Sequence, residues 1–384
     1  ASAAARTIAA ASEIGKRRLR IRRENIMQRS VSITERLRER IAHEGPISFR
    51  DFMAAALYDP QEGYYARGAA IGERGDFVTS PYVSPAFAKA VARRFASDVE
   101  ALEGQLDFVD VGAGEGKFLE DFAAALEAQS PQVASRVFYT AVERSAAGRQ
   151  ALGKKKLSRP LRVVESPKEI PEGSVTGWIF SNELYDALPV VRVTGSSRGL
   201  QELRVDCEGD GFVWRLAPAP DAYREHLEHF GVSLEPGQVG EISFGAAPLH
   251  RTLARALRRG WLVAFDYGHR SPALYHASAR RHGTLAVHFA GLRRGDPLSR
   301  PGQVDLTAHV HWDLLVEAGE AEGLVTQGIS RQGRWLIEAG LFDFAQGDAE
   351  RWRAYRLVDP EGMGEELSVL VQSKSIEQRA TNPG

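Results

Sequence analysis

The sequence has only one cysteine, Cys207, among 384 residues. A single thiol excludes a disulfide within the chain and a thiolate metal cluster, and it fits a reducing compartment. There is no run of about 18 apolar residues, so the sequence predicts no membrane span. The formal net charge of -1 lacks the basic surplus of nucleic-acid-binding proteins, so we expect no nucleic-acid partner. The length and the ordinary composition predict a globular chain of one or two domains.

Residues 1–30 differ from the rest because they begin Ala/Ser-rich and then become strongly basic between Lys16 and Arg23. One interpretation is a mitochondrial transit peptide. The other is an extension upstream of a true start at Met27 in a bacterial gene. We expect a disordered extension and a bacterial cytoplasmic protein, with the mitochondrial matrix as the alternative location. Residues 375–384 are expected to form a flexible tail.

Residues 31–104 are predicted to form a helical region interrupted by a loop. Ile33, Leu37 and Ile41 recur at helical spacing, and residues 87–99 form a second amphipathic stretch. The long glycine-punctuated segment between them is typical of a binding loop or lid. The lid residues expected to contact substrate are Gly75, Asp76, Phe77, Thr79 and Ser80.

Residues 105–374 alternate between short apolar strands and amphipathic helices, which is typical of a parallel sheet covered on both faces. Around residues 190–245 the alternation is interrupted, and Glu208-Gly209-Asp210-Gly211 indicates a hairpin and therefore a β-ribbon insertion. We predict an α/β, Rossmann-like class I methyltransferase fold with a seven-stranded, mostly parallel sheet. The predicted strands are Phe108–Val111, Val137–Val142, Leu161–Val164, Trp178–Ser181, Leu262–Tyr267, Leu324–Gly328 and Leu367–Gln372, and the helices are Lys117–Ala128, Ser145–Leu152, Ala246–Arg259, Thr307–Ala318 and Gly333–Ala339.

A glycine loop joins the first strand to its helix, with the sequence Asp-Val-Gly-Ala-Gly-Glu-Gly-Lys from Asp110 to Lys117. Glycines allow positive φ and a close approach of ligand to backbone, and the helix N-terminus offers free N–H groups. Nicotinamide enzymes use G-x-G-x-x-G, whereas G-x-G-x-G after an acidic residue is common in methyltransferases, where the acid helps position the ammonium group of methionine. A purely structural turn is the alternative. The expected S-adenosyl-L-methionine contacts are Asp110, Gly112, Ala113, Gly114 and Gly116.

Glu143 ends the second strand. A carboxylate at this place can accept protons from both ribose hydroxyls, as the ribose acid of dinucleotide folds does. Alternatively, Glu143 stabilises the N-terminus of the next helix through its dipole. Because it follows the glycine loop at a suitable distance, we predict the ribose role.

Polar residues at the end of the fourth strand, Asn182, Glu183 and Asp186, are the predicted catalytic residues. Ligands of open α/β sheets bind beyond the carboxyl ends of the strands. Carboxylates there can hold an amine or guanidinium, orient a nitrogen lone pair and accept a proton. A polar helix cap is the alternative. Asp266 and Tyr267 end the fifth strand and are expected to face the same edge as substrate contacts.

Asp305 and Thr307 precede the predicted helix over residues 307–318. Either one of them caps this helix or it contacts substrate. His309 and His311 would point in different directions on a helix, so we expect no metal site.

Longer sequence motifs give the chain a resemblance to the MidA family over about residues 47–373. The family is similar in fold to other class I methyltransferases, and it includes a mitochondrial complex I assembly protein that methylates arginine. The resemblance implies that Gly75 to Ser80 close over cofactor and substrate, and that Asn182 and Glu183 lie beside the transferred methyl. The chain departs from the family pattern at Tyr82, Lys89 and His311, where acids are usual. The matching words are Ala56-Leu57-Tyr58-Asp59-Pro60, Gly63-Tyr64-Tyr65, Gly75-Asp76-Phe77-Val78-Thr79-Ser80-Pro81, the Gly112 loop, Asn182-Glu183, Asp186-Ala187-Leu188-Pro189, Asp266-Tyr267-Gly268, Asp305-Leu306-Thr307-Ala308-His309-Val310 and Met363-Gly364-Glu365.

By this resemblance we expect an S-adenosylmethionine-dependent methyltransferase that acts on a nitrogen of a protein side chain. The implied target is an arginine of a respiratory complex I subunit. The alternatives are a small-molecule methyltransferase and a catalytically silent assembly factor that binds S-adenosylmethionine. A protein substrate is the expected partner, and the sequence is compatible with a homodimer.

Overall fold

The computed structural model describes residues 32–67, 78–289, 292–293 and 295–376. The basic extension over residues 1–30, most of the lid loop and most of the C-terminal tail, which were predicted from the sequence, lie outside these residues. Within the described part of the chain, no helix has the length and apolar character needed to cross a membrane.

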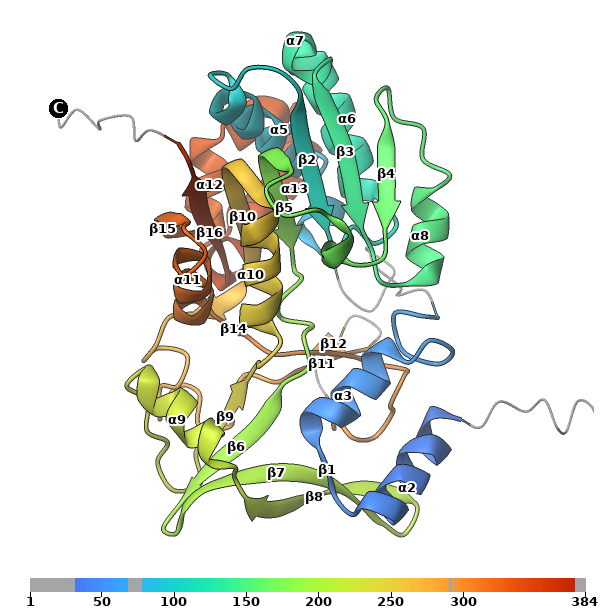
Figure 1. The fold of residues 1–384 in the computed structure, drawn as a ribbon, viewed down its shortest axis with the longest axis vertical. Helices are drawn as coiled ribbons and strands as arrows, with labels where there is room; N and C mark the ends of the chain where they lie inside the picture. Colours follow the sequence, from blue (N-terminus) through green and yellow to red (C-terminus); the bar gives the residue numbers. More distant parts are fainter. Residues whose placement is uncertain (1–31, 68–77, 290–291, 294, 377–384) are drawn as a thin grey trace, which may run out of the picture.

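A central sheet carries the seven strands that the sequence predicts (Figure 1). Its strand order is β15-β16-β10-β5-β2-β3-β4, and β16 is antiparallel to both of its neighbours while the other pairs are parallel. This confirms the Rossmann-like fold, and the structure adds that the last strand is antiparallel. The strands are β2 (Leu106–Val111), β3 (Val137–Val142), β4 (Leu161–Val164), β5 (Val175–Asn182), β10 (Leu257–His269), β15 (Val325–Arg331) and β16 (Leu367–Lys374).

Helices cover both faces of this sheet, which explains why its inner strands are almost continuously apolar. Phe108 of β2 belongs to the cluster under the helices of one face, and its ring lies 3.9 Å from that of Phe122. Its neighbour Val109 belongs to the cluster on the opposite face, as the alternation of a strand requires. One face carries α5 (Ala86–Val99), α6 (Lys117–Gln129), α12 (Gln332–Glu338) and α13 (Asp348–Val358), and the other carries α10 (Ala246–Ala256) and α11 (Trp312–Glu320).

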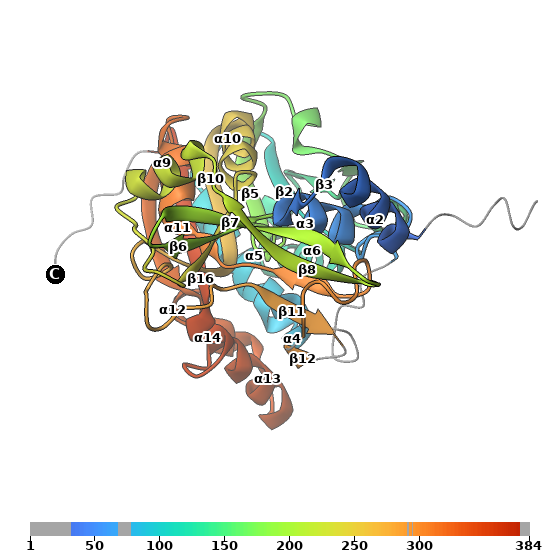
Figure 2. The same ribbon diagram turned by 90° about the horizontal axis from the view of Figure 1, so that it is seen from below.

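The N-terminal region and the insertion build a second sheet together, with the order β1-β7-β6-β9 and β8 paired to β7. The predicted hairpin is confirmed, because Glu208 pairs with Gly211 across its turn. Ile47 pairs with Val205 of the insertion, and Phe49 contacts Trp214 with ring centroids 5.1 Å apart. Figure 2 shows the long β7–β8 ribbon crossing α3. These elements are α2 (Ile33–Glu44), β1 (Ile47–Ser48), α3 (Phe49–Tyr58), β6 (Val191–Ser196), β7 (Gly199–Glu208), β8 (Gly211–Pro218), α9 (Asp221–His229) and β9 (Val239–Ile242).

A third, small sheet corrects the helix predicted over residues 307–318. Asp305 and Thr307 lie in a strand, Leu306 pairs with Val287, and the helix begins only at Trp312. Pairing with distant strands has overridden the local helical pattern here, so neither Asp305 nor Thr307 caps a helix. This sheet contains β11 (Ala286–Phe289), β12 (Leu292–Arg293) and β13 (Asp305–Thr307), while β14 (Val310–His311) joins β10 of the central sheet.

Short elements complete the described chain, and several element boundaries differ from their predictions. Helix α10 ends at Ala256 instead of Arg259, because β10 already pairs with β5 from Leu257 onward. The remaining elements are α4 (Ser80–Val83), α7 (Pro131–Ala134), α8 (Ala146–Leu152), η1 (Pro167–Glu169), η2 (Leu341–Phe344) and α14 (Met363–Glu366).

Candidate functional site

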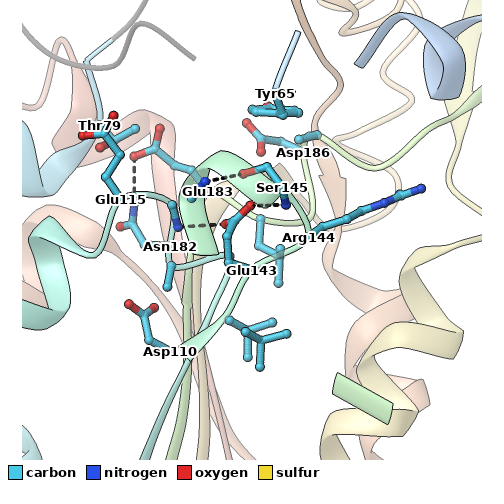
Figure 3. Close-up of a pocket in the computed structure, with 18 of the residues that line it drawn as sticks. Tyr65, Thr79, Asp110, Glu115, Glu143, Arg144, Ser145, Asn182, Glu183 and Asp186 are labelled. Atoms are coloured by element: carbon cyan, nitrogen blue, oxygen red, sulfur yellow. Dashed lines mark hydrogen bonds between the residues drawn. The ribbon is translucent and has the colours of Figure 1, made fainter. Parts of the chain in front are cut away.

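A cavity of about 1170 Å³ lies at the carboxyl ends of the central strands. Figure 3 shows Asp110 on the side of the sheet, Tyr65 and Asp186 at the opposite end, and Asn182 with Glu183 between them. The cavity therefore has a cofactor end and a distal end. Its lining includes Tyr58, Tyr65, Thr79, Asp110, Gly112, Ala113, Gly114, Glu143, Arg144, Asn182, Glu183, Asp186, Tyr267, Asp305, Thr307 and His309.

The glycine loop turns tightly at the end of β2. Gly112, Gly114 and Gly116 have φ of 79°, 54° and 77°, in the region that favours glycine. A Cβ on Gly116 would lie 2.5 Å from Cδ2 of Leu152, whereas a Cβ on Gly114 would meet no heavy atom within 4 Å. Gly116 thus lets the helix approach its neighbour, and Gly114 leaves the cavity open beside the loop.

Glu143 is fixed by backbone hydrogen bonds from both sides. The N–H of Gly114 donates to Oε2 at 2.9 Å, and the N–H of Ser145 donates to Oε1 at 2.7 Å. Each carboxylate oxygen can accept a further hydrogen bond, which suits the two hydroxyl groups of a ribose.

Gly148 belongs to this arrangement and was missed from the sequence. A Cβ there would lie 2.6 Å from Cγ of Glu143 and 2.9 Å from the carbonyl oxygen of Gly114. The Glu-Arg-Ser-Ala-Ala-Gly spacing that follows β3 was the available signal, but it becomes meaningful only once the two loops are known to touch.

Asp110 is only 4% exposed, and its Oδ2 has no hydrogen-bond partner among the described residues. Burial, assisted by the nearby charge of Glu143, raises the pKa of Asp110 to about 7. A buried carboxyl with an unpartnered oxygen is well suited to an ammonium group, which would restore its ionised form. The cofactor end therefore fits both the amino-acid and the ribose parts of S-adenosylmethionine.

The turn after β5 holds Glu183 in a backbone conformation that non-glycine residues rarely adopt, with φ of 52°. Its N–H donates to the carbonyl of Phe265 at 2.8 Å, and its Oε1 accepts from Asn182 Nδ2 at 3.0 Å and from the N–H of Ser80 at 3.2 Å. Burial and the neighbouring Asp186 raise the pKa of Glu183 to about 8. Strain of this kind persists where the surroundings enforce it and is concentrated at functional sites.

The distal end combines carboxylates with aromatic rings. Tyr65 donates from its hydroxyl to Asp305 Oδ1 at 2.9 Å and stacks on Tyr58 with ring centroids 5.4 Å apart. Burial, Asp266 and Asp305 together raise the pKa of Asp186 well above its usual value. Asp305 therefore belongs to the cavity wall, and its contact with a substrate stays a prediction.

The structure does not bring every predicted site residue into the cavity. Asp266 is fully buried behind the wall, where its carboxylate accepts the backbone N–H groups of Leu184, Tyr185 and Tyr267 at 2.7–3.0 Å. It therefore holds the turn around Glu183 in place. Ser80 is buried as well, with its hydroxyl donating to Gln332 at 2.9 Å. Thr79 and Tyr267 line the cavity, and Gly75, Asp76 and Phe77 lie outside the described residues.

The cavity wall is strongly acidic. Among the described residues, eight carboxylates but only three lysine or arginine side chains line it. Because buried carboxyls that repel one another are stabilised by a nearby cation, such a site favours positively charged guests. A sulfonium and a guanidinium both satisfy this requirement. The carboxylates are Asp110, Glu115, Glu143, Glu165, Glu183, Asp186, Asp305 and Glu366.

The strand order, the glycine loop after β2 and the acid that directly follows β3 define a class I S-adenosylmethionine-dependent methyltransferase. Residues 90–330 match the model of a family of S-adenosyl-L-methionine-dependent methyltransferases, and the chain belongs to this family. It is 32% identical to a candidate methyl transferase from Burkholderia thailandensis, solved with S-adenosyl-homocysteine, at a TM-score of 0.80 and with 90% of this chain and 92% of that chain covered.

Two curated relatives carry a more specific name. The chain is 26% identical over 342 residues to mitochondrial protein arginine methyltransferase NDUFAF7 of Mus musculus, covering 79% of this chain and 72% of that protein. It is 27% identical over 347 residues to the Drosophila melanogaster homolog, covering 77% and 71%. The comparisons confirm the resemblance found in the sequence and S-adenosyl-L-methionine as the cofactor.

Proposed function

We propose that this methyltransferase transfers a methyl group to an arginine side chain of a protein. The observation that carries the proposal is the acidic distal end of the cavity, where Glu183, Asp186 and Asp305 line the wall with Tyr65. A guanidinium is planar, permanently charged and able to donate several hydrogen bonds at once, so it suits a pocket of carboxylates and aromatic faces. Two curated relatives are named as arginine methyltransferases of proteins.

The cofactor supplies an activated methyl group on a positively charged sulfur. Asp110 would hold the ammonium group of the cofactor and Glu143 its ribose, in the same cavity as Asn182 and Glu183. The guanidinium nitrogen that accepts the methyl group would lose one N–H proton, and the donor would leave as the neutral thioether. Glu183 would accept that proton.

The raised pKa of Glu183 is consistent with this role. Without a cation nearby, burial keeps the Glu183 carboxyl protonated at pH values below its pKa of about 8. A bound guanidinium would favour the ionised form and so prepare the base at neutral pH. Asn182, which donates to Glu183 at 3.0 Å, would orient it.

The test is radiolabelled methyl transfer from S-adenosylmethionine into a lysate from cells that lack the gene. Labelled protein is hydrolysed and its amino acids are separated. Methylarginine is expected with the wild-type protein, and little or none with Glu183→Gln. Glu228→Gln serves as the matched control, because Glu228 is an exposed partner of Arg224 on α9. Label in another amino acid, or only in small molecules, would overturn the proposal.

A further inference from the structure

A positively charged cluster adjoins the acidic cavity, at the end of β10. It consists of His269, Arg280 and Arg331, which come from β10, from the segment that follows it and from the end of β15. The guanidinium of Arg280 donates to Nε2 of His269 at 2.5 Å and to the carbonyl of Ala273 at 2.8 Å. Residues from β10, from the segment directly after it and from the end of β15 thus gather donor groups at one place.

The charges of this cluster are not balanced. Arg331 pairs with Glu365 at 3.0 Å, but among the described residues no carboxylate lies within 4.0 Å of Arg280. Burial and the proximity of Arg331 lower the pKa of Arg280. In the part of the chain that the structure describes, these two guanidinium groups have one carboxylate partner, Glu365, which leaves a surplus positive charge in a partly buried place that an anion would compensate.

His269 presents a further donor. Because a guanidinium can only donate, Nε2 of His269 must accept, and the proton of the neutral ring then lies on Nδ1. Burial and the two arginines keep the ring neutral by lowering the pKa of His269 to about 4. The arrangement therefore offers the single N–H of a neutral imidazole, at Nδ1, beside the N–H groups of two guanidinium groups.

The cluster lies beside the ring of His309, which lines the cavity. The ring of His269 lies 5.3 Å from that of His309, which in turn lies 6.3 Å from that of Tyr267, and both His309 and Tyr267 line the cavity. We infer that His269, Arg280 and Arg331 form an anion subsite that binds an aspartate or glutamate side chain of the substrate protein, close in sequence to the arginine that is methylated. This inference rests on the proposed function.

Charge complementarity favours this occupant. The cavity selects a cation, and the neighbouring cluster selects an anion, so together they recognise a segment in which an arginine and an acidic residue are near each other. A carboxylate accepts two parallel N–H bonds from a guanidinium, and this geometry distinguishes it from a simple point charge.

The experiment begins with the protein that the wild-type enzyme labels. The methylated site is located by mass spectrometry, and a peptide around it is synthesised together with a version in which the nearby Asp or Glu is replaced by Asn or Gln. Wild-type enzyme should show a KM about tenfold higher for the replaced peptide, with kcat within about twofold, because the subsite contributes binding away from the reacting nitrogen.

Arg280→Gln should raise KM for the original peptide by a similar factor and should not raise it further for the replaced peptide, since both changes remove the same interaction. Arg331→Gln gives an independent variant should Arg280→Gln fold poorly. Arg281→Gln is the matched control, because Arg281 is directed toward the carbonyl of Pro236 at 3.1 Å, and its KM should equal that of the wild type.

A methylated site without a neighbouring acidic residue, or additive effects of the enzyme and peptide changes, would overturn the subsite while leaving arginine methylation intact. If the wild-type enzyme labels no protein at all, the proposed function fails and the subsite falls with it. If the labelled acceptor is a free guanidino acid, the anion is part of a small molecule, and the inferred protein occupant is wrong.

Discussion

Replacing Gly114 by valine should abolish cofactor binding while costing little more stability than the same change elsewhere. Gly114 has φ of 54°, and a Cβ there meets no heavy atom within 4 Å, so the protein itself does not exclude the new side chain. The methyl groups would instead occupy cavity space beside the loop. We expect the dissociation constant for S-adenosylmethionine to rise at least about 100-fold, or about 2.7 kcal/mol. Titration calorimetry with S-adenosylmethionine and S-adenosylhomocysteine measures this.

Gly209 provides a closely matched control. Its φ is 56°, a Cβ there also meets no heavy atom within 4 Å, and it lies in the β7–β8 hairpin. A side chain in this conformation costs roughly 1–2 kcal/mol, so Gly209→Val and Gly114→Val should lose similar unfolding free energy in urea. Only Gly114→Val should lose binding. If it binds the cofactor within threefold of the wild type, the loop does not form the cofactor site.

Three further outcomes follow from buried carboxyls. Asp110→Asn should weaken binding of S-adenosylmethionine by about tenfold or more in calorimetry, and its melting temperature at pH 8 should not fall, because the variant removes a carboxyl that burial disfavours. Glu183 has a pKa raised from 4.5 to about 8, so the folded protein holds this proton more tightly than the unfolded chain. The unfolding free energy should therefore decrease as pH rises from about 4.5 to 8, by more than about 1 kcal/mol, and Glu183→Gln should flatten this dependence; an unchanged slope in urea titrations contradicts it. Asp266→Asn should lower the unfolding free energy by about 2–4 kcal/mol, because an amide cannot serve all three backbone donors, and a loss below about 0.5 kcal/mol would show that those bonds are unimportant.

The central sheet was predictable because its signals are local. Each strand is an apolar run, and each following helix shows its own periodicity, as in Leu106–Val111 and Lys117–Gln129. The segment from Asp305 to His311 was misread because a polar residue before an apolar stretch resembles a helix start. Its actual conformation depends on partners such as Val287 and Gly268, which no local window contains.

The same distinction applies to the site. Gly114 and Glu143 could be assigned to one ligand because both follow adjacent strands of a known arrangement, and the structure joins them by a hydrogen bond of 2.9 Å. Asp266 was predicted to contact substrate because the sequence pattern ends a strand near it, yet its side chain turns into the protein to accept backbone N–H groups. Side-chain direction at a strand end is decided by tertiary packing, which the sequence pattern does not encode.

The hydrogen bond between Tyr65 and Asp305 joins residues 240 positions apart, and Ile47 pairs with Val205 of the insertion. The elements of the cofactor end, from β2 to β5, are contiguous in the chain between these partners. During synthesis the ribosome therefore completes the elements from β2 to β5 before it makes Val205 and Asp305, with which the N-terminal region pairs. A nascent chain that ends before Asp305 therefore contains the residues of the cofactor end but lacks part of the wall at the distal end of the cavity.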